Sequence, residues 1–131
     1  MKEKEAISNA EKYLESARDN LTEGRDGPMI LNLFAAGEYA INVHLALIGR
    51  KPSTTHEGKM AVMTLAYKNG RITAGEYKAY KRVVDLKPTA QYHPYIKAKQ
   101  KRQMKKGEAE NLFRGVESLV ERMRKLVEQD A

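Results

Sequence analysis

The most concentrated chemistry in this 131-residue sequence lies in residues 87–107, a stretch with seven basic side chains and no carboxylate. The stretch also holds one histidine, His93, and two tyrosines, Tyr92 and Tyr95. Cations neutralise phosphates and release their counterions, and aromatic rings stack on bases. These residue types together favour contact with RNA or a nucleotide. The basic side chains are Lys87, Lys97, Lys99, Lys101, Arg102, Lys105 and Lys106.

The placement of charge supports the same interpretation. The chain has a formal net charge of +7, and residues 86–107 alone account for it, which leaves the other 109 residues neutral. A concentrated basic segment attracts a polyphosphate, whereas evenly spread charge mainly keeps a protein soluble. The alternative is a solvated basic connector between two helices.

The spacing of apolar residues predicts an all-α protein, an up-and-down bundle of about five helices that forms one domain over residues 1–131. Apolar and small residues at steps of three and four predict an amphipathic helix over residues 3–23. Residues 28–48 are apolar on nearly every side and should form the central helix, with Pro28 at its first position. No segment alternates like a strand.

A third helix is expected to begin at a capping box made by Thr54 and Glu57 and to run to about Lys68. The spacing of its apolar residues turns four side chains inward, those of Met60, Met63, Ala66 and Tyr67.

The fourth and fifth helices flank the basic stretch. Thr73 and Glu76 form a second capping box at the start of the fourth helix. Pro88 predicts a boundary or a kink near Lys87. The fifth helix follows the stretch and carries an apolar stripe over residues 112–127.

Polar residues on the central helix have structural explanations. His44 is expected to be buried and hydrogen-bonded. Glu38 and Asn42 lie one turn apart and are expected to form a buried polar pair, with a dimer seam or a ligand pocket as the alternatives.

Several classes of function are excluded by residues that the sequence lacks. Without cysteine there is neither a disulfide nor a thiolate metal site, and no glycine-rich phosphate loop is present. We therefore expect no cofactor and no metal.

The mixed charge of residues 1–5 argues against a secretory signal, and the polar groups within residues 29–48 argue against a membrane span. We therefore expect a cytoplasmic protein without membrane contact.

Four short segments, in this order, resemble the HEPN family, the small helical domains named for nucleotide binding in higher eukaryotes and prokaryotes. The resemblance covers most of the chain. The segments are Phe-Ala-Ala-Gly-Glu-Tyr-Ala at 34–40, Thr-Thr-His-Glu-Gly-Lys at 54–59, Asn-Gly-Arg-Ile at 69–72 and Asp-Leu-Lys-Pro-Thr-Ala-Gln-Tyr at 85–92.

The resemblance implies a homodimeric helical bundle, often encoded beside a minimal nucleotidyltransferase in toxin–antitoxin pairs. Many members are metal-independent endoribonucleases that carry Arg, four to six further residues, His, and sometimes Tyr two positions later. Lys87, His93 and Tyr95 match this pattern, with Lys in place of Arg. By resemblance, His93 would be the general acid/base, Lys87 the phosphate-binding cation and Tyr95 a base-stacking or phosphate-contacting group.

Two alternatives to this function stay open, and the exchange of Arg for Lys motivates the first. Lys offers a mobile point charge where Arg presents a planar fork to two phosphate oxygens, so the exchange weakens positioning in the transition state. A catalytically inactive interaction module, which docks an acidic partner such as a nucleotidyltransferase, is one alternative. A small-ligand binder that uses the bundle interior is the other.

Overall fold

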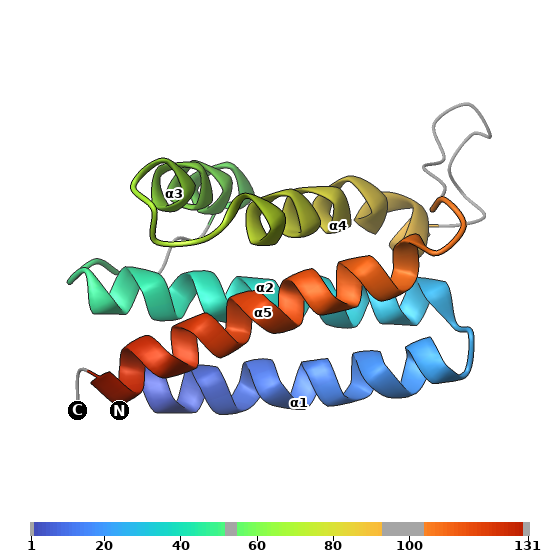
Figure 1. Cartoon of the computed structure of the whole chain (residues 1–131), viewed down its shortest axis with the longest axis horizontal. Coiled ribbons are helices and arrows are strands. Elements are labelled where there is room, and N and C mark those ends of the chain that lie inside the picture. Colours follow the sequence, from blue (N-terminus) through green and yellow to red (C-terminus); the bar gives the residue numbers. More distant parts are fainter. Residues whose placement is uncertain (1, 52–54, 93–103, 130–131) are drawn as a thin grey trace.

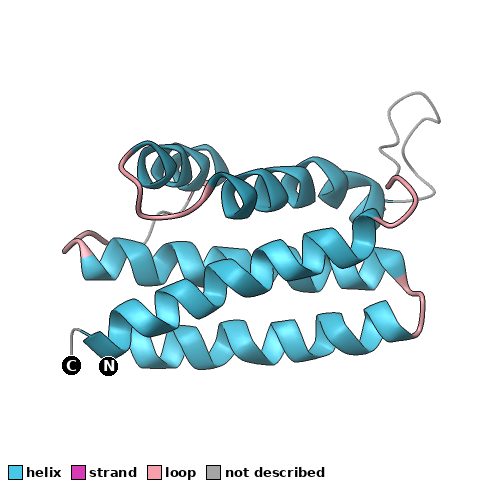
Figure 2. Ribbon diagram, in the orientation of Figure 1, coloured by secondary structure: helices cyan, strands magenta, loops and turns pink. Residues whose placement is uncertain are grey.

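The computed structural model describes residues 2–51, 55–92 and 104–129, which form five helices and no strand (Figures 1 and 2). The predicted all-α class is thereby confirmed. The helices are α1 (Lys2–Thr22), α2 (Asp26–Leu47), α3 (His56–Lys68), α4 (Ala74–Tyr92) and α5 (Glu108–Gln129).

Four long helices build the bundle, and α2 is central because it contacts each of the other described helices. Along the long axis of the molecule, α1, α2, α4 and α5 alternate in direction, whereas α3 is seen nearly end-on and lies across them (Figure 1). The start of α1 and the end of α5 therefore lie at one end of the bundle. The end of α4 and the starts of α2 and α5 lie at the other end.

Two glycines allow α4 to approach its neighbours closely. A Cβ at Gly37 of α2 would lie 2.0 Å from the ring of Tyr80, and a Cβ at Gly115 of α5 would lie 2.3 Å from the Cβ of Ala79. Both distances are far below van der Waals contact. The absence of a side chain at these positions thus fixes how closely α4 packs on α2 and on α5.

The start of α4 confirms the capping box predicted there. The Thr73 N–H donates to Glu76 Oε1 at 2.9 Å, and the Glu76 N–H donates to Thr73 Oγ1 at 3.1 Å. The carboxylate of Glu76 is buried, and it also accepts hydrogen bonds from Ser118 Oγ at 2.5 Å and Arg122 Nε at 2.8 Å. The predicted cap is therefore also a link between α4 and α5.

The third helix ends at Lys68 as predicted, but its N-cap and the exposure of Tyr67 differ from prediction. Its N-cap is Thr55, whose hydroxyl accepts a hydrogen bond from the Gly58 N–H at 3.0 Å, while Thr54 lies outside the described residues. Tyr67 is 39% exposed rather than inward, and its ring stacks on Tyr77. The helix makes few contacts with the bundle, and among its described side chains Met63 and Ala66 alone are buried, so helical spacing overestimates its buried face.

Of the two outcomes predicted near Lys87, a boundary or a kink, the boundary is wrong, because α4 continues through Pro88 to Tyr92. Proline lacks the N–H that would bond to the carbonyl of Val84, a loss that costs about 3 kcal/mol in a helix interior. Leu86 is buried and Ala90 packs against the core, and this packing offsets the loss. The additional turn becomes part of the candidate site.

The second helix begins at Asp26, two residues earlier than predicted, so Pro28 is its third residue. Its missing N–H costs nothing there, because the first four N–H groups of a helix have no intrahelical partner.

Among the described residues, α2 is the one helix whose length and composition would allow it to cross a membrane. Half of its most apolar window is buried inside the protein, and core helices of soluble proteins pass the same test, so this property is weak support for a membrane span.

Two expectations for the polar residues of α2 are corrected. His44 is buried, but its Nδ1 has no hydrogen-bond partner among the described residues. Burial, followed by the positive charge of Arg71, lowers its pKa below 6.5 and keeps the imidazole neutral.

Glu38 and Asn42 do not form a pair. Glu38 binds Lys59 Nζ at 2.5 Å, and Asn42 lines a cavity of about 430 Å³ between α1 and the end of α2.

Candidate nucleic-acid interface

The described chain contains only the two ends of the basic stretch. Lys87 lies in α4, and Tyr92 is the last residue of that helix; Lys105 and Lys106 are separated from α5 by Gly107. The pairing of Lys87 with His93 and Tyr95 therefore stays a prediction. The predicted site residues outside the described ranges are His93, Tyr95, Lys97, Lys99, Lys101 and Arg102.

An ion pair joins α4 to the first residue of α5. Arg82 Nε donates to Glu108 Oε2 at 2.8 Å, and a second guanidinium nitrogen reaches Oε1 at 3.2 Å. The Lys105 N–H donates to the same carboxylate at 2.9 Å. Hydrogen bonding from Arg82 keeps the pKa of Glu108 below its ordinary value. Arg82 lies too far upstream of His93 to match the arginine of the HEPN pattern. Its ion pair with Glu108 instead holds together the two ends of the basic stretch.

The ammonium group of Lys87 lies against an aromatic column. Its Nζ is 4.3 Å from the centre of the Phe34 ring, and Phe34 stacks on Tyr80 at 6.2 Å. A cation over an aromatic face is stabilised by roughly 0.5–1 kcal/mol at exposed sites. The contact keeps the charge of Lys87, on α4, against the Phe34 ring of α2.

Tyr80 itself is not suited to proton transfer. It is fully buried, and its hydroxyl has no hydrogen-bond partner among the described residues. Burial, and secondarily the charge of Glu38, raise its pKa far above 10. The ring serves packing, and its hydroxyl stays neutral.

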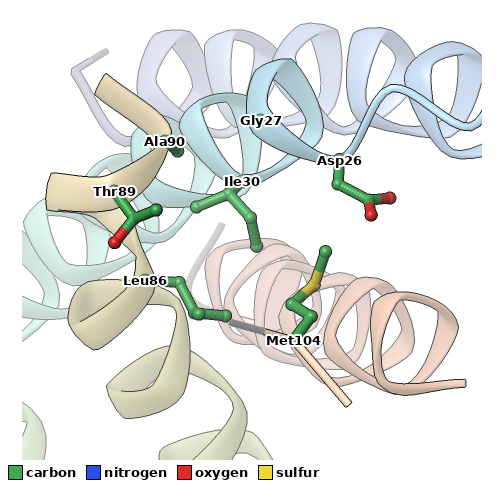
Figure 3. A pocket seen from close by; sticks show the side chains of 7 residues that line it. All are labelled: Asp26, Gly27, Ile30, Leu86, Thr89, Ala90 and Met104. Carbon is green, nitrogen blue, oxygen red and sulfur yellow. The ribbon is translucent and has the colours of Figure 1, made fainter. Parts of the chain in front are cut away.

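A pocket of about 300 Å³ opens where the basic stretch leaves α4 and returns to α5 (Figure 3). This volume is at the lower end of the range for small-ligand sites. Figure 3 shows Asp26 and Thr89 on opposite sides, with Ile30, Leu86 and Met104 between them. The lining is completed by Gly27 and Ala90.

The pocket combines an apolar floor with a polar rim. Asp26 is exposed in the first turn of α2, and its carboxylate makes no hydrogen bond or ion pair within the described part of the chain. At Gly27 there is room for a side chain, since a Cβ would lie 3.8 Å from the carbonyl oxygen of Ala90.

Sequence reasoning missed this pocket for a specific reason. The predicted boundary near Lys87 removes Thr89 and Ala90 from α4, and the predicted start of the central helix at Pro28 removes Asp26 from α2. The available signal was the helical spacing of Leu86 and Ala90, four residues apart, which continues the buried face of α4 past Pro88.

No protein-family model matches the chain, and no curated protein is significantly similar to it in sequence.

Proposed function

We propose that the protein binds RNA or a nucleotide at the end of the bundle where α4 ends and α5 begins. The observation that supports this most strongly is the ion pair of Arg82 with Glu108, which brings both ends of an acid-free, strongly basic stretch to one place beside a pocket.

The charges around this place favour a phosphate ligand. Lys105 and Lys106 are exposed, and their ammonium groups make no hydrogen bond or ion pair with the described residues. The neighbouring carboxylate of Glu108 is already occupied by Arg82 and by the backbone of Lys105. Positive charge is therefore left available at the start of α5 for an anion.

We extend the proposal to RNA cleavage on the resemblance to HEPN endoribonucleases. The 2′-oxygen would attack the phosphorus, the bond to the 5′-oxygen would break, and His93 would move the proton between these two oxygens. Lys87 would stabilise the charge on the phosphate, and Tyr95 would contact the base or the phosphate. A homodimer would bring two such stretches together.

The binding proposal is tested by fluorescence anisotropy with a labelled single-stranded RNA over a series of salt concentrations. The affinity should fall steeply with salt, by a slope of roughly 0.7 per phosphate contact. Lys105→Gln with Lys106→Gln should lower the slope by about 1.4. Exposed lysines elsewhere provide the matched control, Lys68→Gln with Lys78→Gln, which should leave the slope unchanged. A shallow slope in the parent protein would contradict the proposal.

Cleavage is tested with the same RNAs in the presence of EDTA. Products with 2′,3′-cyclic phosphate ends, absent with His93→Ala, would establish the ribonuclease. Lys87→Arg, which restores the residue of the family pattern, should then raise the rate. RNA that is bound but left intact would limit the function to binding, and RNA that is not bound would favour docking of an acidic protein partner.

A further inference from the structure

We propose that the pocket lined by Asp26, Leu86 and Met104 holds a nucleobase, and that Asp26 selects guanine. This inference rests on the proposed function and adds to it a base preference.

The shape and lining of the pocket suit a flat, largely apolar group. Its floor is formed by Ile30, Leu86 and Met104, and its volume of about 300 Å³ lies at the lower end of the range for small-ligand sites. Ile30 and Leu86 are buried, so the floor is held by the core. Methionine adapts to an aromatic edge through its polarisable sulfur.

Positive charge follows the pocket directly along the chain. Met104 lines it, and the exposed Lys105 and Lys106 come next, so a base bound in the pocket has its phosphate within reach of the start of α5. A mononucleotide therefore matches both parts of the surface, the apolar floor and the adjoining cations.

The carboxylate at the rim distinguishes among bases. An ionised Asp only accepts hydrogen bonds, and its two oxygens can accept two parallel donors. On its Watson–Crick edge guanine presents two adjacent donors, N1–H and N2–H, whereas adenine and cytosine present one donor beside an acceptor and uracil presents one donor between two acceptors. Asp26 is exposed and makes no side-chain hydrogen bond to described residues, so it can receive such an edge. Guanine also suits the start of α2, where the N–H groups of Asp26 and Gly27 have no partner among the described residues and can meet its O6.

The test is calorimetric titration of the full chain with GMP, AMP, CMP and UMP. One bidentate contact of this kind discriminates by roughly 10- to 100-fold, so GMP should bind tighter than the others by that factor. Equal affinity for the four, or no binding of any of them, would overturn the inference.

The substitution Asp26→Asn gives a readout that a purely structural role would not produce. Its amide offers one acceptor and one donor, which match N1–H and the 2-carbonyl of xanthine. The preference should therefore change from GMP to xanthosine 5′-monophosphate. An unchanged preference for GMP would place the base elsewhere and overturn the assignment of Asp26.

Two glycines at equivalent helical positions form a matched pair. Gly27 is the second residue of α2 and lines the pocket, and Gly75 is the second residue of α4 and faces open space apart from Thr73. Gly27→Leu should fill the pocket and abolish nucleotide binding, while Gly75→Leu should bind as the parent does. Equal binding by the two variants would contradict the location of the site.

The outcomes separate this inference from the proposed function. RNA binding with a steep salt dependence, combined with no base preference, leaves the proposed function intact and overturns the pocket assignment. Absence of both overturns the two together. The ranking of the four nucleotides uses the parent protein, so it decides the question even where a variant fails to fold.

Discussion

Arg82 and Glu108 lie 26 residues apart in the chain, yet the guanidinium Nε of one is 2.8 Å from a carboxylate oxygen of the other. Their side chains are 28% and 18% exposed, so solvent screens this ion pair only in part. Because α5 begins at Glu108, the pair determines where the chain returns to the bundle after the basic stretch.

The first prediction concerns this ion pair. Arg82→Met should lower the free energy of unfolding by about 1 kcal/mol, the upper end of the range for partly exposed pairs. It should also weaken RNA binding, since the start of α5 is then no longer tied to α4. Urea unfolding and anisotropy measure the two effects. Arg114→Met is the control, because its 2.6 Å pair with Glu110 has side chains that are 71% and 60% exposed. Equal losses in the two variants would contradict a special role for Arg82.

The buried carboxylate of Glu76 should dominate the acid sensitivity of the fold. Burial alone would raise its pKa, but hydrogen bonds from Arg122, Ser118 and the Thr73 N–H hold it below 4.5. Its stabilising contribution is therefore complete above pH 4.5 and is lost as the pH falls through the lower folded-state pKa. Glu76→Gln should cost about 2–3 kcal/mol at pH 7 and flatten the acid limb of the stability curve. Chemical unfolding at a series of pH values measures both, and an acid limb as steep as that of the parent would refute the assignment.

The close approach of α4 to α2 gives a third prediction. Gly37→Ala places a methyl group against the Tyr80 ring and should destabilise the protein by about 1–3 kcal/mol. Gly75→Ala has room for its methyl group and should be neutral or stabilising by up to about 1 kcal/mol. Thermal unfolding of the two variants compares them directly. Similar melting temperatures would mean that the helices separate at little cost.

His44 should produce a separate pH dependence near neutrality. Because its pKa is lowered from 6.5 by burial and by Arg71, the unfolded chain binds a proton more readily than the folded protein. Stability is therefore complete above pH 6.5 and falls as the pH drops from there toward the folded-state pKa. Unfolding measured between pH 7 and pH 5, above the range in which Glu76 titrates, should show this loss in the parent and a smaller loss in His44→Leu. A slope unaffected by the substitution would assign the effect to another group.

The sequence was sufficient for the features that depend on local pattern. The central position of α2 follows from its apolar surface, and the reciprocal hydrogen bonds of Thr73 and Glu76 follow from their spacing. The additional partners of Glu76, by contrast, come from α5, and no local pattern in α4 indicates them.

Features that depend on packing between distant segments were missed. Local propensity ends α4 at Pro88, but contacts of Leu86 and Ala90 with the core extend it. Helical spacing turns Tyr67 inward, but the Tyr77 ring of α4 covers its side chain only in part, and Tyr67 stays 39% exposed. The pocket belongs to this second class, because it needs the first turn of α2, the last turns of α4 and Met104 in one place.

The start of α1 and the end of α5 lie at one end of the bundle, and the pocket opens at the other (Figures 1 and 3). A tag or a surface linker attached before Lys2 or after Gln129 would therefore point away from the proposed interface. Immobilisation through either of these ends would present the proposed interface to solution, which suits ligand screening on a sensor surface.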